Sequence, residues 1–187
     1  GYKFYDSGPY HINLFGFRNK DLTVVDAFND LIGVAYLDQF SNKQCLLFAG
    51  TTKPGLTGLK DKLGNVEGTA ILIPGQYSKS LILGKHNRGK EHEHEALVQN
   101  GSGVFKVWRD SDLDGKFTTT GPVFDNVQGL NLHTTREHLI VRVGGFSMAC
   151  QVVQDDKEHF ILMNIVKRSA EWYPQNKSYD YTLFQLA

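Results

Sequence analysis

Short runs of apolar residues recur along the whole chain, and Gly, Asn and Asp separate them. The runs are rich in β-branched and aromatic side chains, and runs of this kind between turn residues are typical of β-strands. The pattern predicts strands at residues 12–17, 45–48, 69–73, 80–83, 103–108, 139–143 and 181–186.

Two segments instead carry apolar residues at helical spacing. One would begin at Asp21 and run through Ile32, and the other would begin at Asp155 or Asp156 and run through Lys167. The chain has 19 glycines and only 5 prolines, which favours many tight turns. The sequence therefore predicts a mainly β fold, barrel-like or sandwich-like, with a few short helices.

Length and charge limit the classes of partner. At 187 residues the chain can bury a core of its own, and we expect one domain over residues 1–187. The chain has 20 basic residues (Lys and Arg) and 20 acidic residues (Asp and Glu), so its net charge is zero. A neutral chain has no long-range field that would attract nucleic acid. No stretch reaches the ~20 apolar residues of a membrane span. We expect a monomer that binds neither nucleic acid nor a membrane.

The two cysteines, Cys45 and Cys150, are too few for a disulfide framework or a Cys-rich zinc site. Cys45 lies in an apolar run and is predicted to be a buried strand residue. Cys150 follows His133 by 17 positions. A thiol that attacks an acyl carbon needs a histidine within hydrogen-bonding reach, so these two residues are a candidate nucleophile and base.

The segment between His133 and Cys150 permits their contact. A turn at residues 144–145 would let the chain after it pair with the predicted strand 139–143, and so bring Cys150 back toward His133. Small residues at Ser147 and Ala149 would leave room for a substrate carbonyl next to backbone amides. The residues alone also fit a second interpretation, in which both side chains are ordinary core or edge residues.

The segments 133–134 and 147–150 resemble the signature of the L,D-transpeptidase catalytic domain. In that family a histidine and a small residue precede a Ser-x-Gly-Cys element by a similar interval. Further segments resemble uncharacterised phage and bacterial relatives, over roughly residues 10 to 165 in all, namely residues 50–55, 68–77, 96–99 and 107–110.

The resemblance implies a β-rich enzyme without a cofactor, whose thiol attacks peptide bonds next to meso-diaminopimelate in peptidoglycan stem peptides. Cys150 would be the nucleophile and His133 its base, and the carbonyl of Thr134 would orient the imidazole. Ser147 would line the cleft. The substrate-binding residues would be His86, Ala149 and Met148.

The resemblance leaves the reaction and the compartment open. A thioacyl-enzyme can be resolved by water or by an amine, giving a carboxypeptidase, an endopeptidase or a transpeptidase. The enzyme would work in the periplasm or the extracellular cell wall, or a phage would deliver it to its host's wall as a lysis enzyme. The first residues, 1–4, lack the apolar core of a signal peptide, so any leader is not present in this chain.

Three positions depart from the family pattern. Ala149 replaces a glycine, Thr134 stands where glycine or serine is common, and Val152 stands where an arginine often follows the cysteine. A missing arginine weakens recognition of a substrate carboxylate. A non-catalytic wall-binding module of the same fold is therefore an alternative.

Two metal sites are weaker alternatives. A metallohydrolase could use His86, His92 and His94 as ligands. The acidic segment that begins at Asp110 and includes Asp112 and Asp114 matches the first half of a calcium loop. Its twelfth position, where a glutamate closes such loops, is a glycine. No metal is assigned on this basis.

Overall fold

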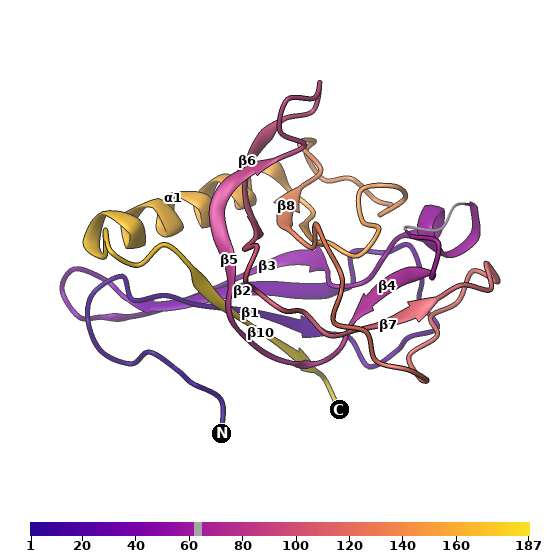
Figure 1. Cartoon of the computed structure of the whole chain (residues 1–187). Helices are drawn as coiled ribbons and strands as arrows, with labels where there is room; N and C mark the ends of the chain where they lie inside the picture. Colours follow the sequence, from indigo (N-terminus) through magenta and orange to yellow (C-terminus); the bar gives the residue numbers. More distant parts are fainter. Residues whose placement is uncertain (62–64) are drawn as a thin grey trace.

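The computed structural model describes residues 1–61 and 65–187, and its main feature is a closed β-barrel. Eight strands form the barrel in the order β1-β10-β5-β6-β8-β9-β3-β2 (Figure 1). Strands hold 36% of the residues and helices 12%, which confirms the predicted mainly β fold. The barrel strands are β1 (Asn13–Arg18), β2 (Asp30–Leu37), β3 (Lys43–Thr51), β5 (Gly75–His86), β6 (His94–Gln99), β8 (Leu132–Thr134), β9 (Gln151–Val153) and β10 (Tyr179–Gln185).

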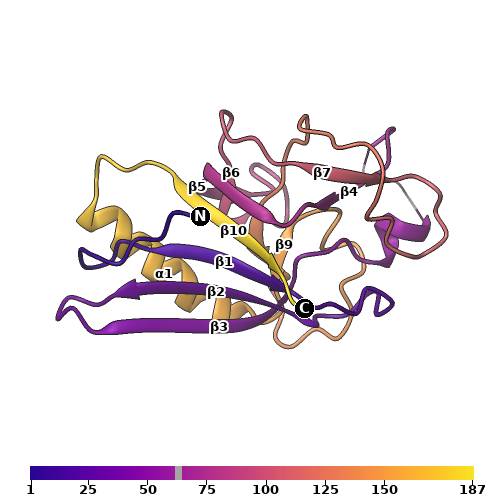
Figure 2. The same cartoon turned by 90° about the horizontal axis from the view of Figure 1, so that it is seen from below.

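Three smaller elements complete the fold. Strands β4 (Thr69–Leu72) and β7 (Val107–Asp110) pair antiparallel in a separate sheet beside the barrel, and η1 (Thr57–Asp61) is a short π-helical turn (Figure 2). The long helix is α1 (Asp156–Trp172), and the side chain of Asp155 caps it by accepting a hydrogen bond from the backbone N–H of Lys157. The predicted start of this helix is confirmed.

Helix α1 packs against the inward face of the barrel strands. Its buried Leu162 and Val166 belong to one apolar core with strand residues such as Ile32, Val34 and Tyr181. Each fully buried side chain of this kind contributes roughly 1.5–3 kcal/mol relative to its exposed state. The helix thus fixes the strands next to it, among them β8 and β9, with which it is in contact.

A buried polar network lies where β1 and β3 end and β2 begins. Arg18 donates to the hydroxyl and carbonyl of Thr52 and to the carbonyl of Leu72. Asp30 accepts from the N–H and hydroxyl of Thr52, and its other oxygen lies 3.3 Å from the ammonium of Lys53. Arg18, Asp30 and Lys53 are at most 2% exposed, so one carboxylate balances two buried cations.

The predicted helix after Asp21 is wrong. The Asp21 carboxylate accepts from the N–H and hydroxyl of Thr23, a local turn that competes with a helix, and Asp26 has a positive φ of 60°. The apolar residues beyond Asp30 form β2, in which Ile32 is buried and Leu31 is 37% exposed. The apolar run therefore alternates with the period of a strand.

The predicted strand at residues 139–143 is also wrong. Only Arg142 forms an isolated bridge, to Ala27, while Leu139 has a positive φ of 51° and Val141 is 80% exposed. The predicted strand at 103–108 begins later, at Val107. Strand β8 lies between β6 and β9, which leaves no barrel edge for residues 139–143 to join.

Candidate functional site

His133 lies on β8, and Cys150 comes directly before β9, the parallel strand next to it. In the β8–β9 ladder His133 pairs with Val152, and just before it the N–H of Gln151 donates to the carbonyl of Asn131. Paired residues point to the same face of a sheet, and side chains alternate along a strand. Cys150 comes directly before β9, two residues, or about 6–7 Å along an extended chain, from the residue that pairs with His133. The expected pairing through residues 139–143 is wrong, and a parallel pairing takes its place.

His133 is held in one tautomer. It is 2% exposed, and its Nδ1 lies 2.8 Å from the carbonyl oxygen of Thr134, which can only accept. Nδ1 therefore carries the hydrogen and Nε2 carries the lone pair. Burial, together with the neighbouring His86, His94 and His159, holds the pKa of His133 well below its usual value, so the imidazole is neutral at rest.

The thiol of Cys150 is directed elsewhere in this conformation. Its Sγ lies 3.4 Å from the carbonyl oxygen of Gly129, and no hydrogen bond joins it to His133 in the described part of the chain. Burial raises the pKa of Cys150 to about 11. The thiol and the imidazole are thus both neutral at rest, without the ion pair of a preactivated cysteine.

The residues just before Cys150 hold the backbone in place. Ser147 is fully buried, and its hydroxyl donates to the carbonyl of Cys150 at 2.8 Å. Met148 lies next to Gly58, and Ala149 packs against the apolar core. None of these three side chains lines the cavity beside His133, so this structure does not place them where a substrate in that cavity would meet them.

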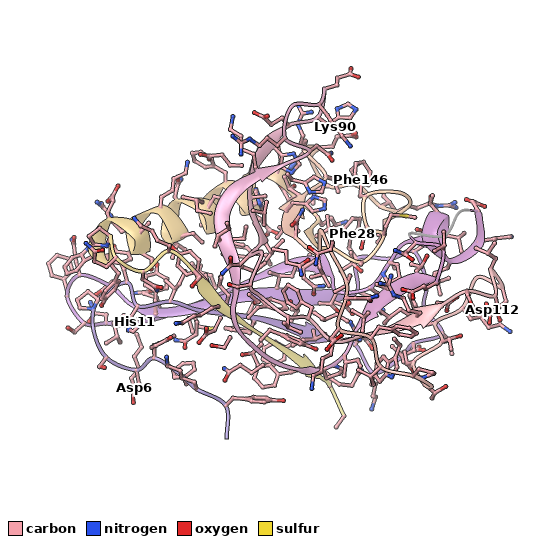
Figure 3. All side chains as sticks on the ribbon, in the orientation of Figure 1. Asp6, His11, Phe28, Lys90, Asp112 and Phe146 are labelled. Carbon is pink, nitrogen blue, oxygen red and sulfur yellow. The ribbon has the colours of Figure 1, made fainter. Side chains whose placement is uncertain are left out.

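That cavity has a volume of about 720 Å³ and is rich in histidine. Figure 3 shows Phe146, which lines it, on the same side of the molecule as Lys90. The lining includes His86, His92, His94, His133, Thr134 and Arg136. The thiol of Cys150 does not line it.

His86 lies beside His133, and both side chains line the cavity. The two imidazoles stack with their centroids 3.8 Å apart and their planes 9° apart. Asn131 fixes His86, because its side-chain N–H donates to Nδ1 of His86 at 3.0 Å while its oxygen accepts from the N–H of Gln99. Burial lowers the pKa of His86 to about 4.

The sequence analysis did not link His94 to His133, and it did not single out three other residues of this region. These are His159, Asn131 and Arg136. His94 pairs with His86 across the β5–β6 hairpin, so the hairpin register is the signal that could have found it. His159 comes from α1, and its ring centroid lies 6.2 Å from that of His94. No local pattern links a helix residue to these strands.

Acid should destabilise the fold through these histidines. The pKa of His86 is about 4 and that of His159 about 3, both below the 6.5 of an ordinary histidine, because burial disfavours the charged form. Between these values the unfolded chain binds more protons than the folded one, so the free energy of unfolding falls as the pH falls below 6.5. We expect His159 to account for a loss of about 2–3 kcal/mol from pH 7 to pH 4.5, and the partly exposed His86 for a smaller further loss, in urea denaturation with a chelator present.

The matched variant for that titration is His159→Gln, which removes the group with the lower pKa. Its stability should depend less on pH than that of the unchanged protein. An equally steep pH dependence in both proteins would contradict the assignment to His159.

The acidic segment after β7 gives little support to a calcium site. Asp110 accepts from the N–H of Thr118, Asp112 from that of Asp114, and Asp114 from that of Lys116, so the carboxylates face their own backbone. One oxygen of Asp110 is buried without a partner. The three carboxylates are not gathered into one ligand set among the residues described. Asp112 lies far from Phe146 and Lys90 (Figure 3).

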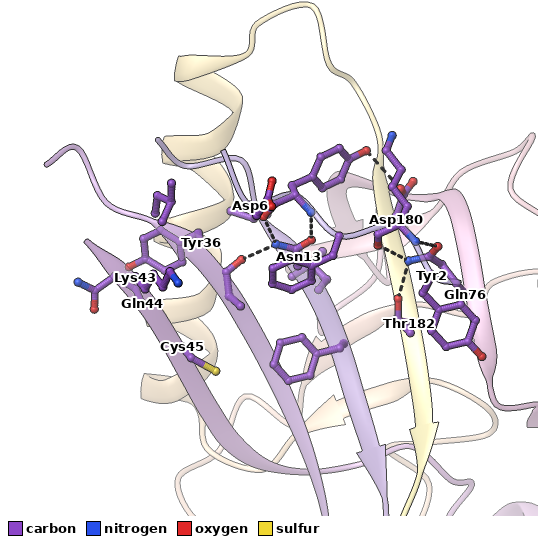
Figure 4. Close-up of a pocket in the computed structure, with 18 of the residues that line it drawn as sticks. Tyr2, Asp6, Asn13, Tyr36, Lys43, Gln44, Cys45, Gln76, Asp180 and Thr182 are labelled. Carbon is purple, nitrogen blue, oxygen red and sulfur yellow. Dashed lines mark hydrogen bonds between the residues drawn. The ribbon is translucent and has the colours of Figure 1, made fainter. Parts of the chain in front are cut away.

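A second cavity, of about 730 Å³, lies on the outer face of β1, β2 and β10 under the N-terminal segment (Figure 4). Aromatic side chains such as Phe15 and Phe184 line it. Cys45 also faces it and is exposed, so the prediction that Cys45 is buried is wrong. In β3, Cys45 and the 48%-exposed Leu47 point outward, while Phe48 points into the core.

No protein-family model, curated protein or solved structure matches this chain. The resemblance to L,D-transpeptidases therefore has only the short sequence segments given above as its support. Within residues 1–61 and 65–187, no helix is both long and apolar enough to cross a membrane.

Proposed function

We propose that the protein is a cysteine-dependent enzyme that acts on peptidoglycan stem peptides, with Cys150 as the nucleophile and His133 as its base. The observation that carries the proposal is the state of His133. Its Nδ1–H is donated to the carbonyl of Thr134, which leaves the buried Nε2 lone pair without a partner among the described residues, on the strand next to the one that Cys150 precedes. A base needs a lone pair of this kind.

The reaction requires the thiol to turn away from Gly129 before attack. Nε2 of His133 then takes the thiol proton while Sγ bonds to the carbonyl carbon of the substrate. The C–N bond breaks, the leaving amine takes the proton from the imidazolium, and a thioacyl-enzyme remains. Water would release a shortened peptide and regenerate the thiol, whereas an amine would form a new peptide bond.

The cavity has a cation that suits the substrate. Val152 cannot bind a carboxylate, but the exposed guanidinium of Arg136 lines the same cavity as His133 and donates to Nδ1 of His92 at 3.1 Å. Arg136 also has a positive φ of 66°, which is uncommon for a residue with a side chain. Stem peptides carry free carboxylates, and arginine is well suited to bind them.

This chemistry places the work in a cell wall, in the periplasm or outside the cell, or in a host wall reached by a phage protein. A non-catalytic wall-binding module is the second candidate. The observation that favours it is the buried thiol of Cys150, whose pKa of about 11 keeps it protonated at rest.

Mass spectrometry of muropeptides tests the proposal. Purified peptidoglycan that contains meso-diaminopimelate is incubated with the protein, digested with a muramidase and compared with an untreated sample. Shortened stems would indicate a carboxypeptidase, lost cross-links an endopeptidase, and new cross-links a transpeptidase. An unchanged muropeptide profile, from folded protein that sediments with the peptidoglycan, would contradict the enzyme and favour the binding module.

A further inference from the structure

Three buried histidine nitrogens in the cluster lack a hydrogen-bond partner. They are the Nε2 atoms of His94, His133 and His159, which come from β6, β8 and α1. A buried polar atom without a partner costs roughly 1–3 kcal/mol, and folded proteins contain few of them. Three of one kind in one cluster therefore point to a ligand that imidazole nitrogens would bind.

Two of the three nitrogens are shown to carry a lone pair. Nδ1 of His94 lies 2.9 Å from the carbonyl oxygen of His92, and Nδ1 of His133 lies 2.8 Å from that of Thr134. Each carbonyl accepts a hydrogen, so each Nε2 is left as an electron-pair donor. An Nδ1–H donated to a backbone carbonyl is also the usual way in which proteins orient a histidine that binds a metal through Nε2.

The spacing of the rings suits one metal ion. The ring centroids of His94 and His133 lie 5.6 Å apart, and those of His94 and His159 lie 6.2 Å apart. Three imidazoles bound tetrahedrally to Zn²⁺ at 2.0–2.1 Å have centroids roughly 5 Å apart. The three Nε2 atoms do not yet surround a single point, since the only three ligand atoms within 4.8 Å of one another in the described chain belong to His138, Asp155 and Asp156. Binding requires the rings to turn inward.

The other two histidines of the cavity are unsuited as ligands. Nδ1 of His86 accepts from Asn131, so its Nε2 carries the hydrogen. Nδ1 of His92 accepts from the guanidinium of Arg136, which places a cation next to it. The ligand set expected from the sequence, His86, His92 and His94, therefore retains only His94.

We propose that His94, His133 and His159 bind a divalent ion of the zinc class through their Nε2 atoms. The cavity beside His94 and His133 gives the ion access and leaves a fourth position for water. All three imidazoles are neutral at neutral pH, because burial lowers their pKa values. If the proposed function holds, the bound ion occupies the lone pair with which His133 would take the thiol proton, so zinc inhibits the enzyme.

Calorimetric titration of the chelator-treated protein with Zn²⁺ tests this site, and Co²⁺ absorption reports a tetrahedral set of nitrogen ligands. We expect one ion per chain. Binding should weaken at least tenfold in His94→Gln and in His159→Gln. Binding should stay within about threefold in His138→Gln, which removes a histidine from the other gathered group.

Circular dichroism checks that each variant is folded, and His94→Gln alone decides the matter if His159→Gln does not fold. No zinc binding by the unchanged protein, or an equal loss in His138→Gln and His94→Gln, would overturn the site. The titration needs no turnover. An inactive protein that binds zinc at these residues would refute only the proposed enzyme, and an active protein that binds none would refute only the metal site.

Discussion

Replacement of Cys150 by alanine is expected to lower the turnover of peptidoglycan stem peptides by a factor of at least about 10³. The alanine has no atom that could form the thioacyl bond. The fold should survive, because the change removes one sulfur atom, which we expect to cost about 1 kcal/mol and a few degrees of melting temperature. Release of shortened or cross-linked muropeptides measures the first effect, and thermal unfolding measures the second.

Cys45→Ala is the matched control, since Cys45 is exposed on β3 and faces the other cavity. It removes the same atom and should leave turnover unchanged. If Cys150→Ala keeps more than about a tenth of the activity of the Cys45→Ala protein, Cys150 is not the nucleophile.

The same experiment can include the proposed base. His133→Gln should lower turnover by about 10²–10⁴, the usual contribution of general-base catalysis. The double variant with Cys150→Ala should be no slower than Cys150→Ala alone, because residues that act as a unit are not additive. Independent, multiplying losses would show that the two side chains do not act together.

Replacement of Asp30 by alanine is expected to lower the free energy of unfolding by about 3–5 kcal/mol. Asp30 is the carboxylate next to Lys53 in the network that also holds Arg18, and it accepts two hydrogen bonds from Thr52. Its loss leaves two buried cations without a counter-charge. Burial already lowers the pKa of Arg18 to about 10, and the charge of Asp30 opposes that shift. Urea denaturation at pH 7 measures the loss.

Asp125→Ala is the control for that variant, because it removes the same charge from an exposed position. It should change stability by less than about 0.5 kcal/mol. The double variant Asp30→Ala with Lys53→Met should recover part of the loss, since one of the unpaired cations is gone. A loss below about 1 kcal/mol in Asp30→Ala would mean that water or another group compensates Arg18 and Lys53.

The pattern of apolar residues was sufficient for most of the strands and for α1, because each of those signals is local. Asp155 begins the helix through a contact with Lys157, two positions further on. The pattern failed from Asp21 to Ile32, where a local turn and a positive φ outweigh the apolar spacing. It also failed for Cys45, because a strand alternates between two faces and the apolar run does not say which face is covered.

The sequence led to His133 and His86, which stack on each other, while the joint action of His133 and Cys150 stays a prediction. The sequence analysis expected the chain before Cys150 to pair with residues 139–143 in a hairpin. In the structure, β8 and β9 pair with each other in parallel instead. Parallel strands are joined by long connections without a local turn signal, so sequence periodicity cannot reveal them. His159 joins the cluster from α1, which packs against the strands. Its place depends on this tertiary packing, so no local sequence pattern reveals it.

The barrel can close only after β10 is made, because β10 lies between β1 and β5. Strand β10 pairs in parallel with β1, where Phe15 faces Thr182, and antiparallel with β5. A chain that is still being synthesised has neither pairing until residue 185 has left the ribosome, so the edges of β1 and β5 stay open until then. Unpaired edges of this kind invite association between chains. Rapid pairing of β10 with β1 and β5 therefore protects both edges at once.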